Sequence, residues 1–169
     1  MQRPQPTQKR YQLNENDFIV SKTDTSGKIT YGNKSFIELS KYSEEELLGA
    51  PHSIIRHPDM PKSVFKLLWS RIQKGEEIFA FVKNLSKDGS YYWVFTNVTA
   101  SQDHKGKNIG YFSVRRKPNE AALQTVIALY KTLIEAEKAG GVDAGVTKLN
   151  TILNEKGVSY DELIISLQQ

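Results

Sequence analysis

Cysteine is absent from all 169 residues of the sequence. A disulfide framework, a thiolate zinc site, a cysteine-ligated iron–sulfur cluster and a photoadduct on a thiol all need cysteine sulfur and are therefore excluded. Only three histidines are present, which is too few for a histidine-rich metal site. We therefore expect no metal centre and no disulfide, in keeping with a reducing compartment.

Long apolar runs are missing as well, and no segment approaches the ~20 apolar residues that a membrane-spanning helix needs. The first residues, MQRPQPTQKR, are polar and contain two prolines, without the apolar core of a secretory signal. We expect residues 1–16 to form a disordered or flexible arm, and we expect no direct insertion into a membrane.

Charge is distributed unevenly along the chain. Residues 1–118 contain 19 Lys and Arg against 12 Asp and Glu, whereas residues 119–169 contain 4 against 7. A basic segment suits a phosphate-bearing ligand or nucleic acid, but these bases are scattered singly, as on an ordinary solvated surface. We therefore expect no nucleic acid partner. Because the sequence contains no Walker loop, GxGxxG motif or recognisable catalytic triad, we do not expect an enzyme.

Short strands and helices alternate through residues 17–118. A β-hairpin is predicted by DFIVSKTDTSGKITYGN, a capped short helix by YSEEELLG, and a longer amphipathic helix by PKSVFKLLWSRIQKG. A three-stranded antiparallel meander is predicted by EIFAFVKNLS, YYWVFTNVTAS and IGYFSVRRK with the turns between them. The fold class is therefore α+β, with a five-stranded antiparallel sheet, short helices on one face and any ligand space between the two layers.

A helical extension is predicted over residues 119–169. Apolar residues recur there at helical spacing in three segments, and Gly140 and Gly141 interrupt the pattern. The apolar stripes of these helices need a partner surface, which can be the sheet, the extension itself or a second copy in a homodimer.

The most unusual stretch is SIIRHPDMPKSVFKLLW, where charged residues stand between prolines at the start of a helix. Arg56 and His57 follow two isoleucines into the expected interior, and both can bind an anionic group. Asp59 either caps the following helix or orients Arg56 or His57. His52 is close enough in sequence to be a fourth member of the group. The ordinary alternative is a charged loop before a proline-initiated helix.

Two further sets of side chains suit a planar heterocyclic ligand. Asn84 and Asn97 lie in predicted strands, where asparagine is disfavoured and either faces water or pairs with something specific. Asn33, after the first hairpin, is a third candidate of this kind. Trp69 and Trp93 can form an aromatic wall, although aromatic residues at such spacing also suit a plain core.

The PAS domain of the aerotaxis-receptor family, bacterial redox-taxis sensors that bind FAD, is similar to three stretches of this chain. They are TDTSGKITYGNKSFIELSKYSEEELLGAPHSIIRHPDMP, VKNLSKDGSYYWVFTNVTAS and GYFSVRRKP. The resemblance covers about residues 17–118, and RHPDMP is its most specific string. It implies a PAS fold with FAD as the cofactor, held by Arg56, His57 and Asp59.

The lack of an apolar spanning segment differs from the single-chain receptors of that family. It resembles instead the two-protein energy-taxis systems, in which a soluble PAS protein signals to a membrane-bound chemoreceptor. The resemblance therefore implies a redox sensor that relays the state of its flavin to such a partner by conformational change. We expect the protein in the cytoplasm, either free or at the inner membrane face through that receptor.

Two other functions fit the same fold class. One is a haem-binding PAS gas sensor with His52 or His57 as the axial ligand, and the other is a PAS interaction module without a cofactor. The visible spectrum of the purified protein distinguishes the three, because flavin, haem and a cofactor-free domain absorb differently.

Overall fold

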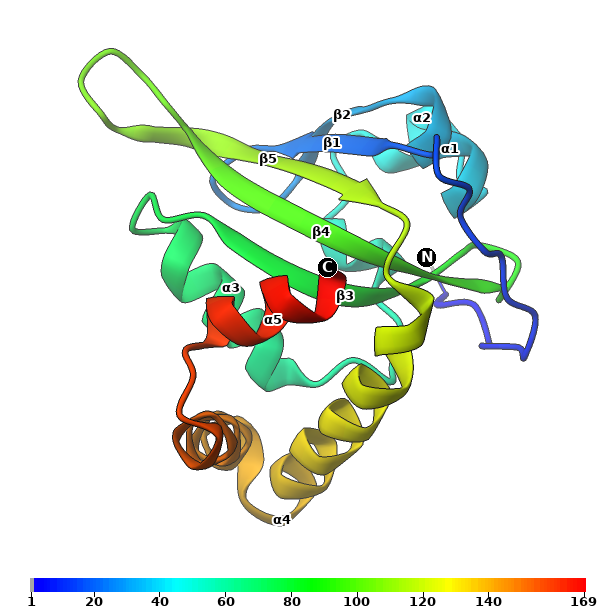
Figure 1. Ribbon diagram of the computed structural model, residues 1–169. Helices are drawn as coiled ribbons and strands as arrows, with labels where there is room; N and C mark the ends of the chain where they lie inside the picture. The colour runs from blue at the N-terminus through cyan, green and yellow to red at the C-terminus, as the bar shows by residue number, and fades with distance from the viewer. Residues whose placement is uncertain (1) are drawn as a thin grey trace.

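The computed structural model describes residues 2–169 (Figure 1). One antiparallel sheet has the strand order β2-β1-β5-β4-β3. Its strands are β1 (Ile19–Thr23), β2 (Ile29–Gly32), β3 (Ile78–Leu85), β4 (Tyr91–Gln102) and β5 (Asn108–Arg116). The helical segments are α1 (Lys34–Ser40), α2 (Glu44–Leu47), η1 (His52–Ile55), α3 (Lys62–Ile72), η2 (Glu120–Ala122), α4 (Leu123–Lys156) and α5 (Tyr160–Gln168). The predicted α+β fold, with its hairpin, short helices, meander and helical extension, is confirmed.

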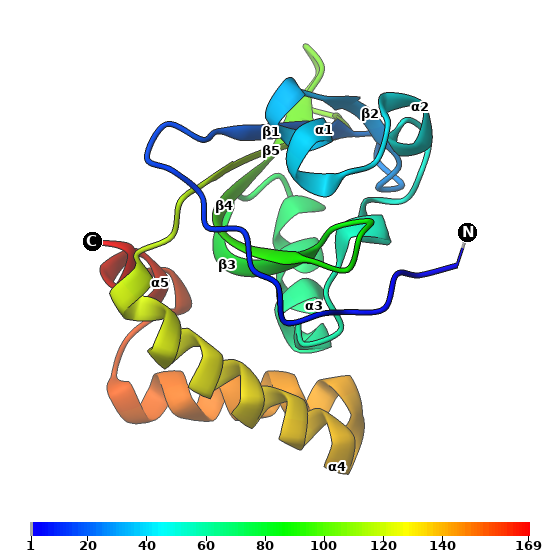
Figure 2. The same ribbon diagram turned by 90° about the vertical axis from the view of Figure 1, so that its right-hand side faces the viewer.

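Helical segments lie on both sides of the sheet. Figure 2 shows α1, α2 and α3 on one side, here called the inner face, and α5 on the other, the outer face. Side chains alternate along β4, so Thr96 points to the inner face and lines a cavity there, whereas Trp93 points outward and packs on Tyr130 of α4. The core therefore has two layers, one on each side of the sheet.

Helix α4 is broken into two halves. At Gly141, φ is 81° and ψ is −175°, a left-handed backbone conformation that glycine adopts at little cost. The chain turns back there (Figure 2), as the sequence predicts. Gly145 is buried against α3, where an added Cβ would lie 2.9 Å from Ser63 Oγ. Within residues 2–169, no helix combines the length and the apolar character needed to cross a membrane.

The strand β3 lies at the edge of the sheet, and three of its backbone carbonyls are paired by groups from other elements. The pairs are Tyr160 Oη to Phe79 O at 2.8 Å, Tyr130 Oη to Phe81 O at 2.5 Å and His57 N to Lys83 O at 3.4 Å. Unpaired carbonyls are costly when buried, and an open sheet edge invites association with other chains. The C-terminal helices thus dock on the sheet of their own chain.

The extension also caps the N-terminus of α3. The N-cap residue of α3 makes no side-chain hydrogen bond of its own. Instead, the carboxylate of Glu137 in α4 accepts hydrogen bonds from Lys62 N at 3.1 Å and Ser63 N at 2.7 Å. A carboxylate is favourable at this end of a helix because the backbone dipole is positive there. Asp59, one candidate for this cap from the sequence, binds Lys83 Nζ at 2.8 Å instead.

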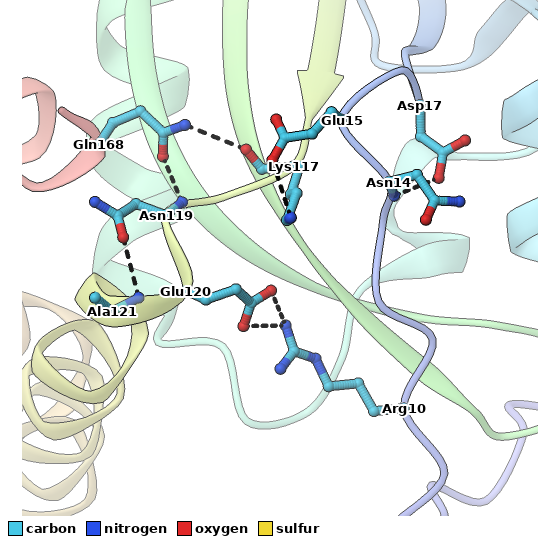
Figure 3. A network of polar contacts seen from close by, with 9 residues as sticks. All are labelled: Arg10, Asn14, Glu15, Asp17, Lys117, Asn119, Glu120, Ala121 and Gln168. Carbon is cyan, nitrogen blue, oxygen red and sulfur yellow. Dashed lines mark hydrogen bonds and ion pairs between the residues drawn. The ribbon is translucent and has the colours of Figure 1, made fainter.

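The N-terminal arm, for which composition predicts flexibility, makes contacts along the domain in the structure. Residues 7–13 run beside the β3–β4 hairpin, where Tyr91 N donates to Lys9 O at 3.0 Å. Arg10 Nη2 binds both carboxylate oxygens of Glu120, at 2.8 and 3.0 Å (Figure 3). The same network contains the pairs Lys117 with Glu15 and Asn119 with Gln168. Composition could not reveal these contacts, because the arm's partners come from distant parts of the chain.

Replacing Tyr130 by phenylalanine tests the pairing at the edge of β3. Tyr130→Phe keeps the ring but leaves the carbonyl of Phe81 without its partner, so we expect the free energy of unfolding to fall by about 1–3 kcal/mol. Tyr31→Phe is the matched control, because Tyr31 is 45% exposed. Denaturant unfolding of both variants beside the parent protein measures the difference. Equal stability of the two variants would show that this carbonyl does not depend on the tyrosine.

Candidate functional site

A cavity of about 300 Å³ lies between the inner face of the sheet and α3. Its walls come from β1, β3, β4, β5, η1, α3 and the turn between β1 and β2. Ligand pockets commonly have volumes of roughly 300–1,000 Å³, so this cavity is at the small end of that range. It occupies the position that the sequence predicts for a ligand space, between the short helices and the sheet.

One wall of the cavity is apolar and aromatic. Phe65, Leu68 and Trp69 line it from α3, and Tyr111 lines it from β5. The rings of Trp69 and Tyr111 meet edge to face, with centroids 5.5 Å apart. Trp69 also lies over Gly27 in the β1–β2 turn, where φ is 86° and a Cβ would come within 3.0 Å of the indole. Glycine is thus required there both by the turn and by the tryptophan.

A polar cluster of Arg115, His52 and Ser21 also lines the cavity. Arg115 on β5 is 2% exposed, and its Nη2 donates to Ser21 Oγ at 2.8 Å. Its Nη1 lies 3.1 Å from Nε2 of His52. Because arginine can only donate, Nε2 accepts and the ring proton of His52 is on Nδ1. The hydroxyl of Ser21, 2.9 Å from Nε2, can then accept from Arg115 and donate to His52.

The protonation of this cluster follows from its burial. Burial, together with the charge of Arg115, lowers the pKa of His52 to about 3, so the imidazole is neutral at physiological pH. Burial also lowers the pKa of Arg115 to about 10, which still leaves the guanidinium charged. The cluster therefore carries one positive charge.

Arg56 adds a second positive charge to the cavity wall. Its guanidinium carbon lies 3.8 Å from the centre of the Phe65 ring, a cation–π contact. Burial, and to a lesser degree the charge of Arg3, lowers the pKa of Arg56. Among residues 2–169, no carboxylate forms an ion pair with Arg56 or Arg115. The cavity is therefore electrostatically suited to an anionic group.

Three polar atoms of residues that line the cavity are buried without a hydrogen-bond partner within the described part of the chain. They are Asn84 Nδ2, Arg56 Nε and Arg115 Nε. Buried polar groups in folded proteins are almost always paired. A ligand that accepted hydrogen bonds from these donors would satisfy them.

Four of the nine site residues predicted from the sequence line this cavity: Arg56, His52, Trp69 and Asn84. They come from the loop before α3, from η1, from α3 and from β3. The structure thus brings together side chains that are up to 32 residues apart in the sequence.

His57 and Asp59 lie outside the cavity and hold the loop before α3 against β3 and β4. His57 is 3% exposed, its Nδ1 accepts a hydrogen bond from Asp59 N at 3.0 Å, and its ring meets that of Tyr91 edge to face. Burial and the nearby charge of Lys83 lower the pKa of His57 to about 4, which makes the ring neutral. Contact of either residue with a cofactor stays a prediction.

Asn33, Trp93 and Asn97 do not line the cavity either. Asn33 Oδ1 accepts hydrogen bonds from Phe36 N and Val20 N, and so caps α1. Trp93 and Asn97 share the outer face of β4, because side chains two residues apart on a strand point the same way. The inner face is formed by the even-numbered residues of this strand. The structure therefore separates Asn97 from Asn84, although the sequence presents both as the same kind of candidate.

Arg115 and Ser21 line the cavity without having been predicted. The alternation of IGYFSVRRK contains the signal, since Tyr111, Ser113 and Arg115 share one face of β5 and all three line the cavity. The scatter of single bases along the chain had suggested a solvated surface for each of them.

Comparisons with known proteins identify the family of the chain. The PAS fold family matches residues 29–115. The aerotaxis receptor of Escherichia coli (strain K12) is 38% identical over 130 residues, which cover 77% of this chain and 26% of that receptor. The biofilm dispersion protein BdlA of Pseudomonas aeruginosa is 27% identical over 85 residues, 50% of this chain and 20% of that protein. The chain thus spans about a quarter or less of the length of these relatives.

Solved structures share the fold. The light-state structure of the blue-light photoreceptor Aureochrome1 LOV has a TM-score of 0.57 and 26% identity, and the match covers 68% of this chain and 90% of that chain. A light-oxygen-voltage domain described with a flavin analogue has a TM-score of 0.57 and 24% identity, covering 68% of this chain and 86% of that one. The chain belongs to the PAS family, and its predicted resemblance to the aerotaxis receptors is confirmed.

Proposed function

We propose that this chain is a flavin-based redox sensor that binds FAD in the cavity beside α3 and relays its redox state to a membrane-bound, chemoreceptor-type partner. The observation that carries the proposal is a cavity with an aromatic wall, two guanidinium groups without acidic partners and an unpaired amide. The similarity to the aerotaxis receptor supports it.

The residues that line the cavity fit a flavin. The flat ring system needs an apolar slot, which Trp69 and Tyr111 offer, and a donor for its pyrimidine edge, which Asn84 Nδ2 offers. The volume of about 300 Å³ suits the ring system rather than the whole dinucleotide. Half-buried Arg56 in the cavity wall would hold the diphosphate through its positive charge. When bound, the flavin supplies reversible electron uptake, which changes the charge of its ring.

The strand β3 offers a route from the cavity to the extension. Val82 and Asn84 line the cavity from this strand, while its edge carbonyls accept the hydroxyls of Tyr130 and Tyr160. A changed hydrogen bond at Asn84 would shift β3 and strain both tyrosine contacts. The C-terminal helices are therefore placed to respond to the cavity, as a local charge change biases a switch elsewhere.

The two alternative functions find less support in the geometry. As a haem ligand, His52 would have to give up its hydrogen bonds to Arg115 and Ser21 and bind iron beside a guanidinium. In a module without any cofactor, buried donors such as Asn84 Nδ2 would stay unpaired, which is unfavourable. Flavin binding accounts for both features.

The cofactor itself is the most direct test. We expect the purified protein to be yellow, with flavin absorption bands, and to release FAD on denaturation, identified by its mass. A haem Soret band would support the gas-sensor alternative. A colourless protein that takes up no added FAD under oxidising or reducing conditions would contradict the proposal.

Arg56→Ala tests the expected phosphate contact. Removal of a charged hydrogen bond should lower the affinity for FAD about 10- to 100-fold, while the flavin-free protein keeps most of its stability. Arg116→Ala is the control, because Arg116 is exposed and packs over Phe95 on the outer face. FAD titration and denaturant unfolding measure the two effects separately. Unchanged affinity in Arg56→Ala would exclude Arg56 from the binding site.

The role of β3 as a relay can be tested by hydrogen exchange. We expect the amides of α4 to differ in protection between the oxidised and the reduced protein, and we expect Tyr130→Phe to reduce that difference while the flavin stays bound. Tyr31→Phe should leave the difference intact. If oxidised and reduced protein protect α4 equally, the signal leaves the domain by another surface.

A further inference from the structure

Arg115 is a buried cation whose hydrogen-bond partners are both uncharged. Ser21 and neutral His52 fix the direction of the guanidinium, and Nε has no partner within the described chain. The ring of Phe36 lies 4.9 Å from the guanidinium carbon and supplies a cation–π contact rather than a counter-charge. The positive charge is therefore held in place without being neutralised.

Two other partly buried arginines, Arg10 and Arg71, have acidic partners. Arg10 pairs with Glu120 at 2.8 Å and Arg71 with Asp161 at 2.6 Å. Burial of a charge without a counter-ion is strongly unfavourable, so the position of Arg115 implies an anion that the chain does not provide. Because Arg115 lines the cavity, such an anion can reach it from there.

We infer that Arg115, positioned by Ser21 and His52, is the anion-recognition element of the cavity and makes it favour a ligand group with negative charge. Applied to flavin, the inference rests on the proposed function. The cavity then binds the reduced, anionic ring more tightly than the oxidised, neutral ring. The oxidised ring takes up two electrons from a reductant, dithionite in the experiment below, and one proton. The ring therefore gains one negative charge, which the positive charge of the Arg115 guanidinium stabilises.

The reduction potential of bound FAD measures this preference. Arg115→Met removes the charge, keeps an unbranched side chain and leaves the hydroxyl of Ser21 within reach of His52. In a dithionite titration against a reference dye, we expect its midpoint potential to fall by about 30 mV or more, which corresponds to a tenfold loss of preference for reduced flavin. Arg115→Lys should restore most of the potential. Unchanged potential in Arg115→Met overturns the inference.

Two controls separate recognition from a structural role. Arg116→Met changes the neighbouring base on the outer face and should leave the potential unaltered. Flavin-free Arg115→Met should resist denaturant at least as well as the parent protein, because an uncompensated buried charge has been removed. A less stable variant with a normal potential would show that Arg115 acts only in folding.

A pair of dyes tests the anion preference without flavin. Anilinonaphthalene sulfonate carries a negative charge, whereas phenylnaphthylamine has similar rings and none. The flavin-free full chain should bind the sulfonate at least tenfold more tightly, and Arg115→Met, but not Arg116→Met, should lose that preference. If the chain binds no FAD but keeps this result, the proposed function fails and the anion site stands. Equal binding of the two dyes, or binding of neither, overturns the inference that Arg115 recognises an anion.

Discussion

Closure of the free edge of β3 is the interaction on which the rest of the molecule depends. Hydroxyls from α4 and α5 and the backbone of the loop before α3 pair with successive carbonyls of this edge. Without them, a buried strand would expose unpaired groups and invite association with other chains. Because side chains alternate along a strand, β3 also presents Val82 and Asn84 to the cavity. One strand thus belongs both to the ligand space and to the surface on which the extension docks.

The two sides of β3 differ in whether their basic side chains have acidic partners. On the cavity side, Arg56 and Arg115 have no acidic partners, and the nearby imidazole of His52 is neutral. On the opposite side of β3, Lys83 pairs with Asp59, and in the last turn of α3, Arg71 pairs with Asp161. A cavity lined by buried charges without counter-ions lowers the stability of the empty protein and raises its affinity for an anionic ligand. In the proposed function, the flavin supplies the missing negative charge.

Most of the fold could be predicted from the sequence, because its signals act over a few residues. The capping box of Ser43 and Glu46 and the break at Gly141 appear as expected. The candidate site was harder to predict, because alternation along a strand shows which residues share a face but not which face meets the cavity. Asn84 and Asn97 therefore could not be told apart. Arg115 was not predicted, because its hydrogen-bond partners Ser21 and His52 lie 94 and 63 residues away in the sequence.

The cap on α3 extends the role of the C-terminal helices to the other wall of the cavity. Glu137 accepts the hydrogen bonds that a residue at the start of α3 would otherwise have to accept. Helix α3 carries Phe65, Leu68 and Trp69 into the cavity, so the extension supports both that wall and, through the tyrosines, β3. A ligand that moved either α3 or β3 would therefore also act on the C-terminal helices, which contact both of these elements. In the proposed function, this double attachment makes the extension, rather than the β2 edge of the sheet, the element best placed to report on the cavity.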